Sequence, residues 1–516
     1  MKSPVWIAEI PRKTAAAGPL QGLTFAIKDN IDYAGVPTTA ACPAYAYTPA
    51  KSAPIVATLE QAGAVAVGKT NMDQFATGLV GVRSPYGAPS SVFNAEYISG
   101  GSSSGSAVAV ASGQVDFALG TDTAGSGRVP AAFNNIVGLK PSKGVISNEG
   151  VVPACASLDC VTIFTRDIAT CARVYETVLP RPASLPGWAT GKFRFGILPV
   201  NQREFFGDIA AASLYQDSID RLAALGGVAV EFDYTPFKDA ASLLYAGPWV
   251  AERYAAVGEF IASHKDAVNP TVRDIILGAT KYSAVDAFQA SYKLEALRVK
   301  SLPTWDTVDF LLLPTTGTTY KIAEVEAEPL KLNTNLGYYT NFVNLLDLAA
   351  IAIPAGFRPN GLPFGVSLIA PARTDWALIE LAARLEEVRI TVVGAHLTGQ
   401  PLNKQLTERN ARLVRTCKTA KNYRLYSLAN TTPPKPGLVR EEGFDGPGID
   451  VEVWAMPARN FGSFVNLIPP PLGIGSIILE DGVREMGFIC EPQGLKGALE
   501  ITSFGGWKKW RASLQQ

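Results

Sequence analysis

The chain has 516 residues, enough for about two to four domains with large buried cores. Its 46 Lys and Arg residues balance its 46 Asp and Glu residues, which excludes functions that need a strong attraction to nucleic acid or to an anionic membrane. The sequence contains two histidines, His264 and His396, so histidine-based catalytic triads and metal sites are disfavoured.

Apolar stretches such as residues 345–357 are interrupted by Asp347 and Pro354, so we expect no membrane-spanning helix. The first residues lack the apolar core of a secretory signal. The six cysteines show neither the spacing of metal ligands nor the density of a disulfide scaffold. We therefore expect reduced thiols and a cytoplasmic protein without nucleic-acid or membrane partners.

The first third of the chain alternates apolar runs with helical patterns. Lys28 ends an apolar run typical of a buried strand, and residues 64–67 predict another strand. Residues 99–131 predict a glycine- and serine-rich loop, a helix of small residues, a strand and a second glycine turn. A flexible linker would not contain a buried helix and strand, and no phosphate-binding motif accompanies these two loops.

Later segments complete an α/β pattern. Residues 208–225 have helical apolar spacing and end before two glycines. Residues 309–313, 348–353 and 365–369 are apolar runs bounded by proline or glycine, as in strands buried on both faces. These elements predict an α/β domain over residues 1–395, with a mixed central β-sheet flanked by helices.

A second domain is predicted near the end of the chain. Residues 396–422 are polar and partly helical, and we expect them to form a linker. Residues 423–516 contain short apolar runs between turns rich in proline and glycine, followed by a terminal helix. This pattern is typical of a small β-rich domain.

The second glycine turn has a composition that suits acyl transfer. That chemistry needs a hydroxyl nucleophile, a base, and backbone N–H groups directed at the developing oxyanion. Ser126 supplies a hydroxyl, and the small residues Thr123, Ala124 and Gly125 leave their amides and that of Ser126 accessible. Lys28 is a candidate base, because a desolvated lysine loses its proton near neutral pH, although a lysine at a strand end is more often solvated or ion-paired.

Lys28, residues 100–105 (GGSSSG) and residues 122–128 (DTAGSGR) together resemble the amidase signature family. This resemblance implies the family's fold and a Ser-Ser-Lys triad. In that triad Ser126 matches the acylated nucleophile, Ser102 matches the bridging serine that follows a cis peptide bond, and Lys28 matches the base.

Residues 244–254 and 337–357, with the predicted second domain, resemble the allophanate hydrolases within this family. The resemblance implies that Tyr245 and Arg253 hold a substrate carboxylate, which a guanidinium binds through two hydrogen bonds. Pro248 suits the first turn of a helix and would place Arg253 shortly inside it. In the alternative interpretation, Arg253 lies on a helix surface and Tyr245 packs in the core.

The implied reaction is hydrolysis of the terminal amide of allophanate, which is urea carrying a carboxylate on one nitrogen. Its products are ammonia and an N-carboxylated carbamate that decarboxylates to ammonia and carbon dioxide. The resemblance implies no metal or cofactor, a homodimer, and a urea carboxylase on a separate chain as a partner. Alternatives are another signature amidase, such as a component of an amidotransferase or an aliphatic amidase, and a non-catalytic scaffold subunit.

The predicted second domain is similar to the γ-glutamyl cyclotransferase-like domain of full-length allophanate hydrolases. Decarboxylation and assembly are both open roles for it. Because no histidine follows His396, we expect any acid–base role in this domain to fall to residues such as Glu452 or Glu491.

Overall fold

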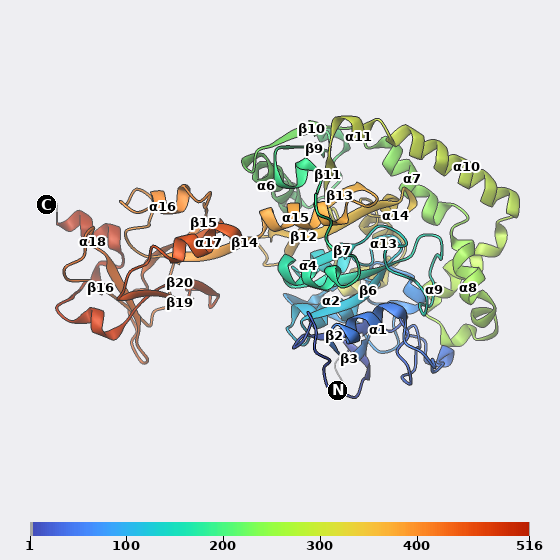
Figure 1. The fold of residues 1–516 in the computed structure, drawn as a ribbon, viewed down its shortest axis with the longest axis horizontal. Coiled ribbons are helices and arrows are strands. Elements are labelled where there is room, and N and C mark those ends of the chain that lie inside the picture. The colour runs from blue at the N-terminus through green and yellow to red at the C-terminus, as the bar shows by residue number, and fades with distance from the viewer. Residues whose placement is uncertain (1–3, 515–516) are drawn as a thin grey trace. The chain divides into compact units, whose positions relative to one another are not determined.

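The computed structural model describes residues 4–514. The chain forms two compact units, Met1–Ala383 and Arg384–Gln516. In Figure 1 the first unit runs from blue through green to orange, and the second continues from orange to red. Within residues 4–514, the structure contains no helix that is both long enough and apolar enough to cross a membrane.

The first unit is built around an eleven-stranded mixed sheet. In order across the sheet, its strands are β1 (Trp6–Glu9), β3 (Val65–Thr70), β2 (Thr24–Lys28), β6 (Phe117–Asp122), β8 (Cys160–Thr165), β7 (Val137–Lys140), β12 (Leu348–Phe357), β13 (Pro363–Pro371), β11 (Phe310–Pro314), β9 (Phe193–Ile197) and β10 (Gly227–Glu231). Strand β2 is parallel to both β3 and β6, whereas β6, β8, β7 and β12 are successively antiparallel. A separate hairpin joins β4 (Ser90–Ser91) and β5 (Asn94–Ile98).

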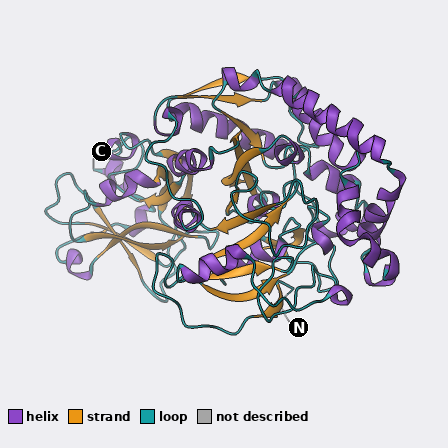
Figure 2. Ribbon diagram, turned by 45° about the vertical axis from the view of Figure 1, so that its right-hand side comes forward, coloured by secondary structure: helices purple, strands orange, loops and turns teal. Residues whose placement is uncertain are grey.

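Helices surround the strands of the first unit, as Figure 2 shows. They are α1 (Pro54–Gln61), α2 (Ser104–Ala111), α3 (Val129–Phe133), α4 (Ile168–Glu176), α5 (Gly187–Thr190), α6 (Ile209–Ala224), α7 (Thr235–Ala246), α8 (Val250–Ser263), α9 (Pro270–Leu277), α10 (Ala284–Ser301), α11 (Thr304–Thr307), α12 (Ile322–Ala327), α13 (Lys331–Leu336), α14 (Asn341–Leu345) and α15 (Asp375–Leu385). Helix α2 packs on β2, β6 and β8, and α6 packs on β12 and β13. Because helices cover them, β6, β7, β8 and β11 carry buried residues along their whole length.

The mixed α/β fold predicted for this part of the chain is confirmed. The predicted strands at 309–313, 348–353 and 365–369 lie in β11, β12 and β13, and the prediction at 64–67 overlaps the start of β3. The predicted helix at 208–225 is α6 with its two flanking residues. Buried strands and long amphipathic helices were therefore evident from apolar spacing alone.

The second unit contains two smaller sheets. The five-stranded sheet has the order β15 (Arg412–Lys418), β18 (Asp450–Pro457), β14 (Glu387–Val392), β20 (Arg484–Cys490) and β19 (Leu472–Ile478), and the three-stranded sheet has the order β17 (Pro436–Arg440), β16 (Tyr423–Ser427) and β21 (Leu499–Glu500). Its helices are α16 (Lys404–Thr407), α17 (Ala458–Val465) and α18 (Trp507–Ser513). The predicted terminal helix is α18, and its side chains Trp507 and Trp510 are buried in the core of this unit.

The boundary between the units lies earlier than the sequence pattern predicts. Strand β14 was expected in the first domain, but it pairs with β18 and β20. The expected linker, residues 396–422, contains β15, which also pairs with β18. Strand β15 lies at the edge of its sheet with exposed and half-buried residues, so it lacks the apolar pattern of a buried strand. The second unit thus begins at residue 384.

Candidate active site

Lys28 lies at an edge of the large sheet where two strands end together. Because β2 and β6 are parallel neighbours, their last residues, Lys28 and Asp122, lie at the same edge. Lys28 is fully buried, and its Nζ donates hydrogen bonds to Ser102 Oγ and Thr121 Oγ1, both at 2.7 Å. The prediction that Lys28 ends a buried strand is confirmed, and a solvated lysine is contradicted.

Burial also changes the protonation of Lys28. Removal from water penalises the ammonium form and lowers the pKa of Lys28 to about 7. The negative charges of Asp73, Asp159 and Asp122 oppose this shift, and the positive charge of Arg253 adds to it. Near neutral pH, Lys28 therefore has a sizeable neutral fraction that can accept a proton.

Ser102 stands between the first glycine-rich loop and helix α2. The peptide bond between Gly101 and Ser102 is cis. The Ser102 carbonyl oxygen accepts a hydrogen bond from the Asp73 N–H at 3.1 Å. A Cβ atom at Gly101 would lie 2.2 Å from the Asp73 carboxylate, so only glycine fits there. These contacts fix the backbone that presents Ser102 Oγ to Lys28.

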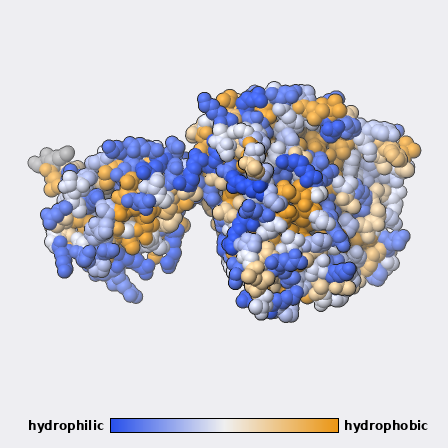
Figure 3. Space-filling model, viewed as in Figure 1, coloured by the Kyte–Doolittle hydropathy of each residue, from blue (hydrophilic) through white to orange (hydrophobic). Residues whose placement is uncertain are grey.

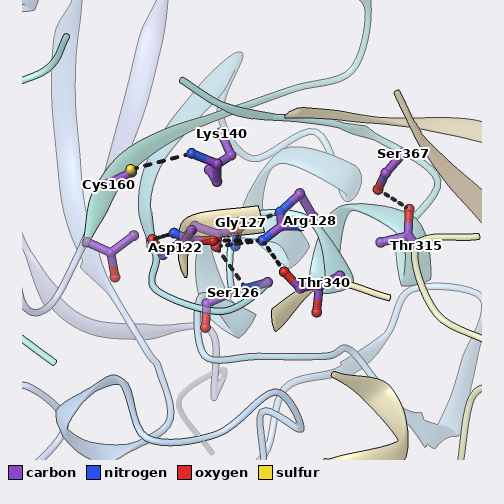
Figure 4. Close-up of polar contacts among 12 residues, drawn as sticks. Asp122, Ser126, Gly127, Arg128, Lys140, Cys160, Thr315, Thr340 and Ser367 are labelled. Carbon is purple, nitrogen blue, oxygen red and sulfur yellow. Dashed lines mark hydrogen bonds and ion pairs between the residues drawn. The ribbon is translucent and has the colours of Figure 1, made fainter. Parts of the chain in front are cut away.

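The loop that carries Ser126 is held by an ion pair, shown in Figure 4. Arg128 Nε lies 2.9 Å from Asp122 Oδ2, and both side chains are fully buried. The Asp122 carboxylate also accepts hydrogen bonds from the N–H groups of Gly125 at 2.8 Å and Gly127 at 3.0 Å. Burial favours the neutral carboxyl, but the charge and hydrogen bonds of Arg128 outweigh it and lower the pKa of Asp122.

A segment far along the chain completes the support of this loop. Arg128 Nη2 donates to the Thr340 carbonyl oxygen at 3.2 Å and to Asn344 Oδ1 at 3.0 Å. Asn344 Nδ2 donates in turn to the carbonyl oxygens of Asp122 at 2.8 Å and Leu158 at 3.1 Å. Helix α14 is therefore joined to both ends of the turn that carries the nucleophile candidate.

The predicted oxyanion-binding group needs one correction. The Gly125 N–H donates to Asp122, so it is not available to an oxyanion. The N–H groups of Thr123, Ala124 and Ser126 donate no hydrogen bond in the part of the chain that the structure describes. The sequence showed small residues in a turn, but it did not show that the carboxylate preceding them bonds to one of their amides.

Ser126 is not hydrogen-bonded to Lys28 or to Ser102 in the part of the chain that the structure describes. Its Oγ donates to the Gly78 carbonyl oxygen at 3.5 Å. Among residues 4–514, no hydrogen bond links Ser126 Oγ to Ser102 Oγ. The structure thus brings Lys28 and Ser102 into contact and holds Ser126 on the turn that follows β6. Hydrogen bonds of this kind commonly shorten only when substrate is bound.

Arg253 belongs to the same site and is not on the surface. Helix α8 begins at Val250, two residues after Pro248, and Arg253 lies in its first turn. The side chain is buried, and its Nη1 donates to Thr77 Oγ1 at 3.0 Å and to the Ala76 carbonyl oxygen at 3.4 Å. The alternative of a surface Arg253 is contradicted. Tyr245 lies in α7, but its side chain is outside what the structure describes.

Two buried carboxylates near the site were not predicted. Asp73 accepts hydrogen bonds from the N–H groups of Gly81 and Arg83, both at 2.9 Å. Asp159 accepts one from Thr123 Oγ1 at 2.5 Å, and burial raises its pKa. Neither aspartate lies in the motifs that resemble the amidase family, so no sequence pattern pointed to them.

The second unit has a small pocket whose lining includes His396, Lys435 and Phe488. His396 Nε2 lies 2.9 Å from Gln405 Oε1, its ring stacks on Phe488 at 5.0 Å, and burial lowers its pKa. His396 therefore lines a pocket of the second unit, contrary to its expected place in a linker. Glu452, an expected acid–base group, is instead bound by Lys508 Nζ at 2.9 Å.

Comparisons with known proteins agree with this geometry. A family model described as Amidase matches residues 5–379, which include Lys28, Ser102, Ser126 and Arg253. The chain belongs to the amidase family. A second model, described as the allophanate hydrolase C-terminal domain, matches residues 388–512 of this amidase, which lie in the second unit.

Three known proteins are similar to this amidase over most of its length. It is 44% identical over 548 residues to urea amidolyase of Lachancea kluyveri, covering 96% of this chain and 30% of that protein. A solved structure of Kluyveromyces lactis allophanate hydrolase has a TM-score of 0.71 and 40% identity, covering 99% of this chain and 94% of that one. A glutamyl-tRNA(Gln) amidotransferase subunit of Heliobacterium modesticaldum is 31% identical, covering 74% of this chain and 86% of that protein. This amidase spans less than a third of the urea amidolyase that it matches.

Proposed function

We propose that this amidase hydrolyses the terminal amide of allophanate through a Ser-Ser-Lys acyl-enzyme mechanism. The observation that carries the proposal is the buried contact between Lys28 and Ser102, in which the lysine has a pKa of about 7. Arg253 is buried and its charge acts on Lys28, so a carboxylate anchor lies close to the base. Homology to the allophanate hydrolase of K. lactis supports the same substrate.

In the proposed reaction, Ser126 Oγ attacks the terminal carbonyl while its proton passes through the Ser102 hydroxyl to neutral Lys28. The N–H groups of Thr123, Ala124 and Ser126 stabilise the oxyanion. Lys28 returns the proton through Ser102 to the leaving nitrogen, and ammonia departs. Water, deprotonated by the same route, then hydrolyses the acyl-enzyme. The released N-carboxylated carbamate decarboxylates to ammonia and carbon dioxide, and no step uses a metal or cofactor.

Substrate selection is proposed to depend on the carboxylate, which Arg253 and Tyr245 hold. Allophanate has few atoms, so one charged anchor supplies much of the discrimination against neutral amides. Homology alone leaves open an amidotransferase-like activity on glutamine, because the amidotransferase protein is also a relative. It covers 74% of this chain, whereas the K. lactis allophanate hydrolase covers 99%.

Arg253→Ala tests this assignment. We expect wild-type protein to release ammonia from allophanate and malonamate in preference to urea, glutamine and propionamide. In the variant, kcat/KM for allophanate should fall at least about 100-fold, because a buried charge-assisted anchor is lost, and propionamide turnover should fall much less. An ammonia-release assay measures both. Equal losses on charged and neutral amides would contradict the anchor, and a wild-type preference for glutamine would contradict the substrate.

We also propose a homodimer, formed through helix α10. One side of α10 packs on the first unit through Ala290, Leu294 and Leu297. The opposite side exposes Val285 (63%), Phe288 (63%), Tyr292 (70%) and Val299 (53%), followed by Leu302 (46%). Hydrophobic residues reach the surface along the margin where α10 runs, as Figures 1 and 3 show together. The spacing of three and four residues is that of a coiled-coil seam.

The seam is complementary to itself in an antiparallel arrangement. If the two-fold axis passes between positions 293 and 294, Val285 faces Leu302 of the second copy, Phe288 faces Val299, and Tyr292 faces Glu295. The Tyr292 hydroxyl can then donate to the partner carboxylate, the one charged group in the seam. Each contact occurs twice, as a two-fold interface requires.

Paired cysteines test this register. The double variant Phe288→Cys with Val299→Cys should form an interchain disulfide under mild oxidation, because facing positions of a coiled coil bring their Cβ atoms close. Each single variant should not. Non-reducing electrophoresis and light scattering measure the outcome. A dimer without cross-linking would contradict the register, and a monomer would contradict the dimer.

The proposed setting is a cytoplasmic pathway of urea breakdown. All six cysteines, at positions 42, 155, 160, 171, 417 and 490, are free, which suits a reducing compartment. Allophanate is the product of urea carboxylation, so we propose that a urea carboxylase supplies the substrate. Homology to a urea amidolyase supports this link.

A further inference from the structure

A short stretch of loop touches the two groups that the proposed mechanism assigns to opposite ends of the substrate. The carbonyl oxygen of Ala76 and Oγ1 of Thr77 accept hydrogen bonds from Arg253 Nη1. The carbonyl oxygen of the residue after Thr77, Gly78, accepts from Ser126 Oγ. The carboxylate anchor and the nucleophile are therefore bound by adjacent residues of one segment.

The same segment is tied to the rest of the site. The Leu79 carbonyl oxygen accepts a hydrogen bond from the Gly101 N–H at 2.8 Å, directly before Ser102. The Leu79 N–H donates to Asn333 Oδ1 at 2.8 Å. The Asp73 carboxylate closes the loop through the N–H of Gly81. Residues 73–81 thus form a fixed template against which the reacting groups are placed.

The backbone of this template is strained at Phe75 and Ala76, whereas Gly78 adopts its positive φ without strain because it has no Cβ atom. Phe75 and Ala76 have left-handed φ angles of 50° and 52°, and Gly78 has a φ of 151°. Left-handed conformations of residues with side chains are costly and persist where the surrounding contacts demand them. Here the strain turns the Ala76 carbonyl toward Arg253 and the Gly78 carbonyl toward Ser126.

The Thr77 hydroxyl has a defined direction. It donates to the Phe75 carbonyl oxygen at 3.2 Å, which leaves its lone pairs to accept from Arg253 at 3.0 Å. The side chain is fully buried. Thr77 therefore orients the guanidinium, and a serine could replace it, whereas an isosteric valine could not.

We propose that Thr77 is a positioning residue that, with Gly78, sets the distance between the carboxylate anchor and the nucleophile. Adjacent Cα atoms lie about 3.8 Å apart, so groups bound by adjacent residues are close together. The proposed substrate, allophanate, has one atom between its carboxylate and its scissile carbonyl, so an anchor held at a fixed distance from the nucleophile should favour acids of that length over longer ω-amide acids. This inference rests on the proposed function, because it takes Arg253 as the anchor and Ser126 as the nucleophile.

The test compares malonamate, with one carbon between its two carbonyl groups, and succinamate, with two. For Thr77→Val we expect KM for malonamate to rise about tenfold with a small change in kcat, because a hydrogen bond to a charged group is lost. The malonamate preference over succinamate should fall by a similar factor. Thr77→Ser should restore both values to near wild type. Propionamide, which lacks a carboxylate, serves as the control substrate.

The outcomes separate a positioning role of Thr77 from a structural one. Parallel losses of kcat on malonamate and propionamide, not restored by Thr77→Ser, would show that Thr77 is merely structural and would overturn the inference. An unchanged KM and an unchanged length preference would also overturn it. If wild-type protein releases no ammonia from allophanate or malonamate, the proposed function itself fails, and this result appears before any variant is made.

Discussion

Replacing Ser126 by alanine is expected to lower ammonia release from allophanate by at least about 10³-fold. The loss is large because the hydroxyl forms the covalent intermediate, and the remaining hydrogen-bond donors cannot replace a missing nucleophile. The side chain makes one long hydrogen bond, 3.5 Å to the Gly78 carbonyl oxygen, so the variant should unfold near the wild-type temperature. A steady-state assay and a thermal melt measure the two effects.

The matched control is Ser112→Ala. Ser112 follows α2 and donates to the Val108 carbonyl oxygen, remote from Lys28 in its contacts. This variant should keep its activity. A serine-reactive phosphonate should add mass to the wild type and to Ser112→Ala but not to Ser126→Ala. Labelling or turnover that survives in Ser126→Ala would exclude Ser126 as the nucleophile, and an unlabelled wild type would indicate a scaffold subunit.

Replacing Lys28 by methionine should also lower activity strongly, but unlike Ser126→Ala it should raise stability at pH 7. Loss of a general base lowers kcat/KM by roughly 10² to 10⁴-fold. In the wild type the base must be neutral, so kcat/KM should rise about tenfold per pH unit below a pKa of about 7 and level off above it. A pH profile of ammonia release without a transition near pH 7 would contradict Lys28 as the base.

The stability effect follows from the same lowered pKa. Lys28 titrates at about 7 when folded and near 10.5 when unfolded, so the unfolded chain binds the extra proton between those values. The titration of Lys28 therefore makes the free energy of unfolding rise with pH across that window. At pH 7 the buried lysine makes the protein less stable than it is at higher pH. Lys28→Met should remove this pH dependence and unfold at a higher temperature than wild type at pH 7. Thermal unfolding of both proteins at pH 7 and 9 measures the difference, and a variant that unfolds at or below the wild-type temperature at pH 7 would contradict it.

The apolar runs of the sequence predicted β2, β3, β6, β11, β12 and β13, but not the other five strands of the large sheet. The sequence also predicted that Lys28 ends a strand, and the amidase resemblance singled out Ser102, which Lys28 contacts. The boundary of the second unit was misplaced because the edge strand β15 has no buried face that produces an apolar pattern. His396 was assigned to a linker for the same reason, although it lines a pocket.

Contacts between distant residues explain what the sequence could not show. The bond between Arg253 and Thr77 joins positions 176 residues apart, and no local pattern encodes it. The bond from Gly125 to Asp122 is local, but it depends on the side-chain conformation of Asp122, which Arg128 fixes. Composition indicated a candidate anion-binding turn, and only the folded geometry shows which of its amides are already bonded.

The hydrogen bonds of Asn344 have a consequence for biosynthesis. Arg128 and Asn344 are 216 positions apart, so the turn that presents Ser126 obtains its full support only after α14 has left the ribosome. Until then, a nascent chain already contains Lys28, Ser102 and Ser126, but it lacks the hydrogen bonds from α14 that support the Ser126 turn. The candidate nucleophile therefore gains its complete set of supporting contacts only when translation of the first unit is nearly finished.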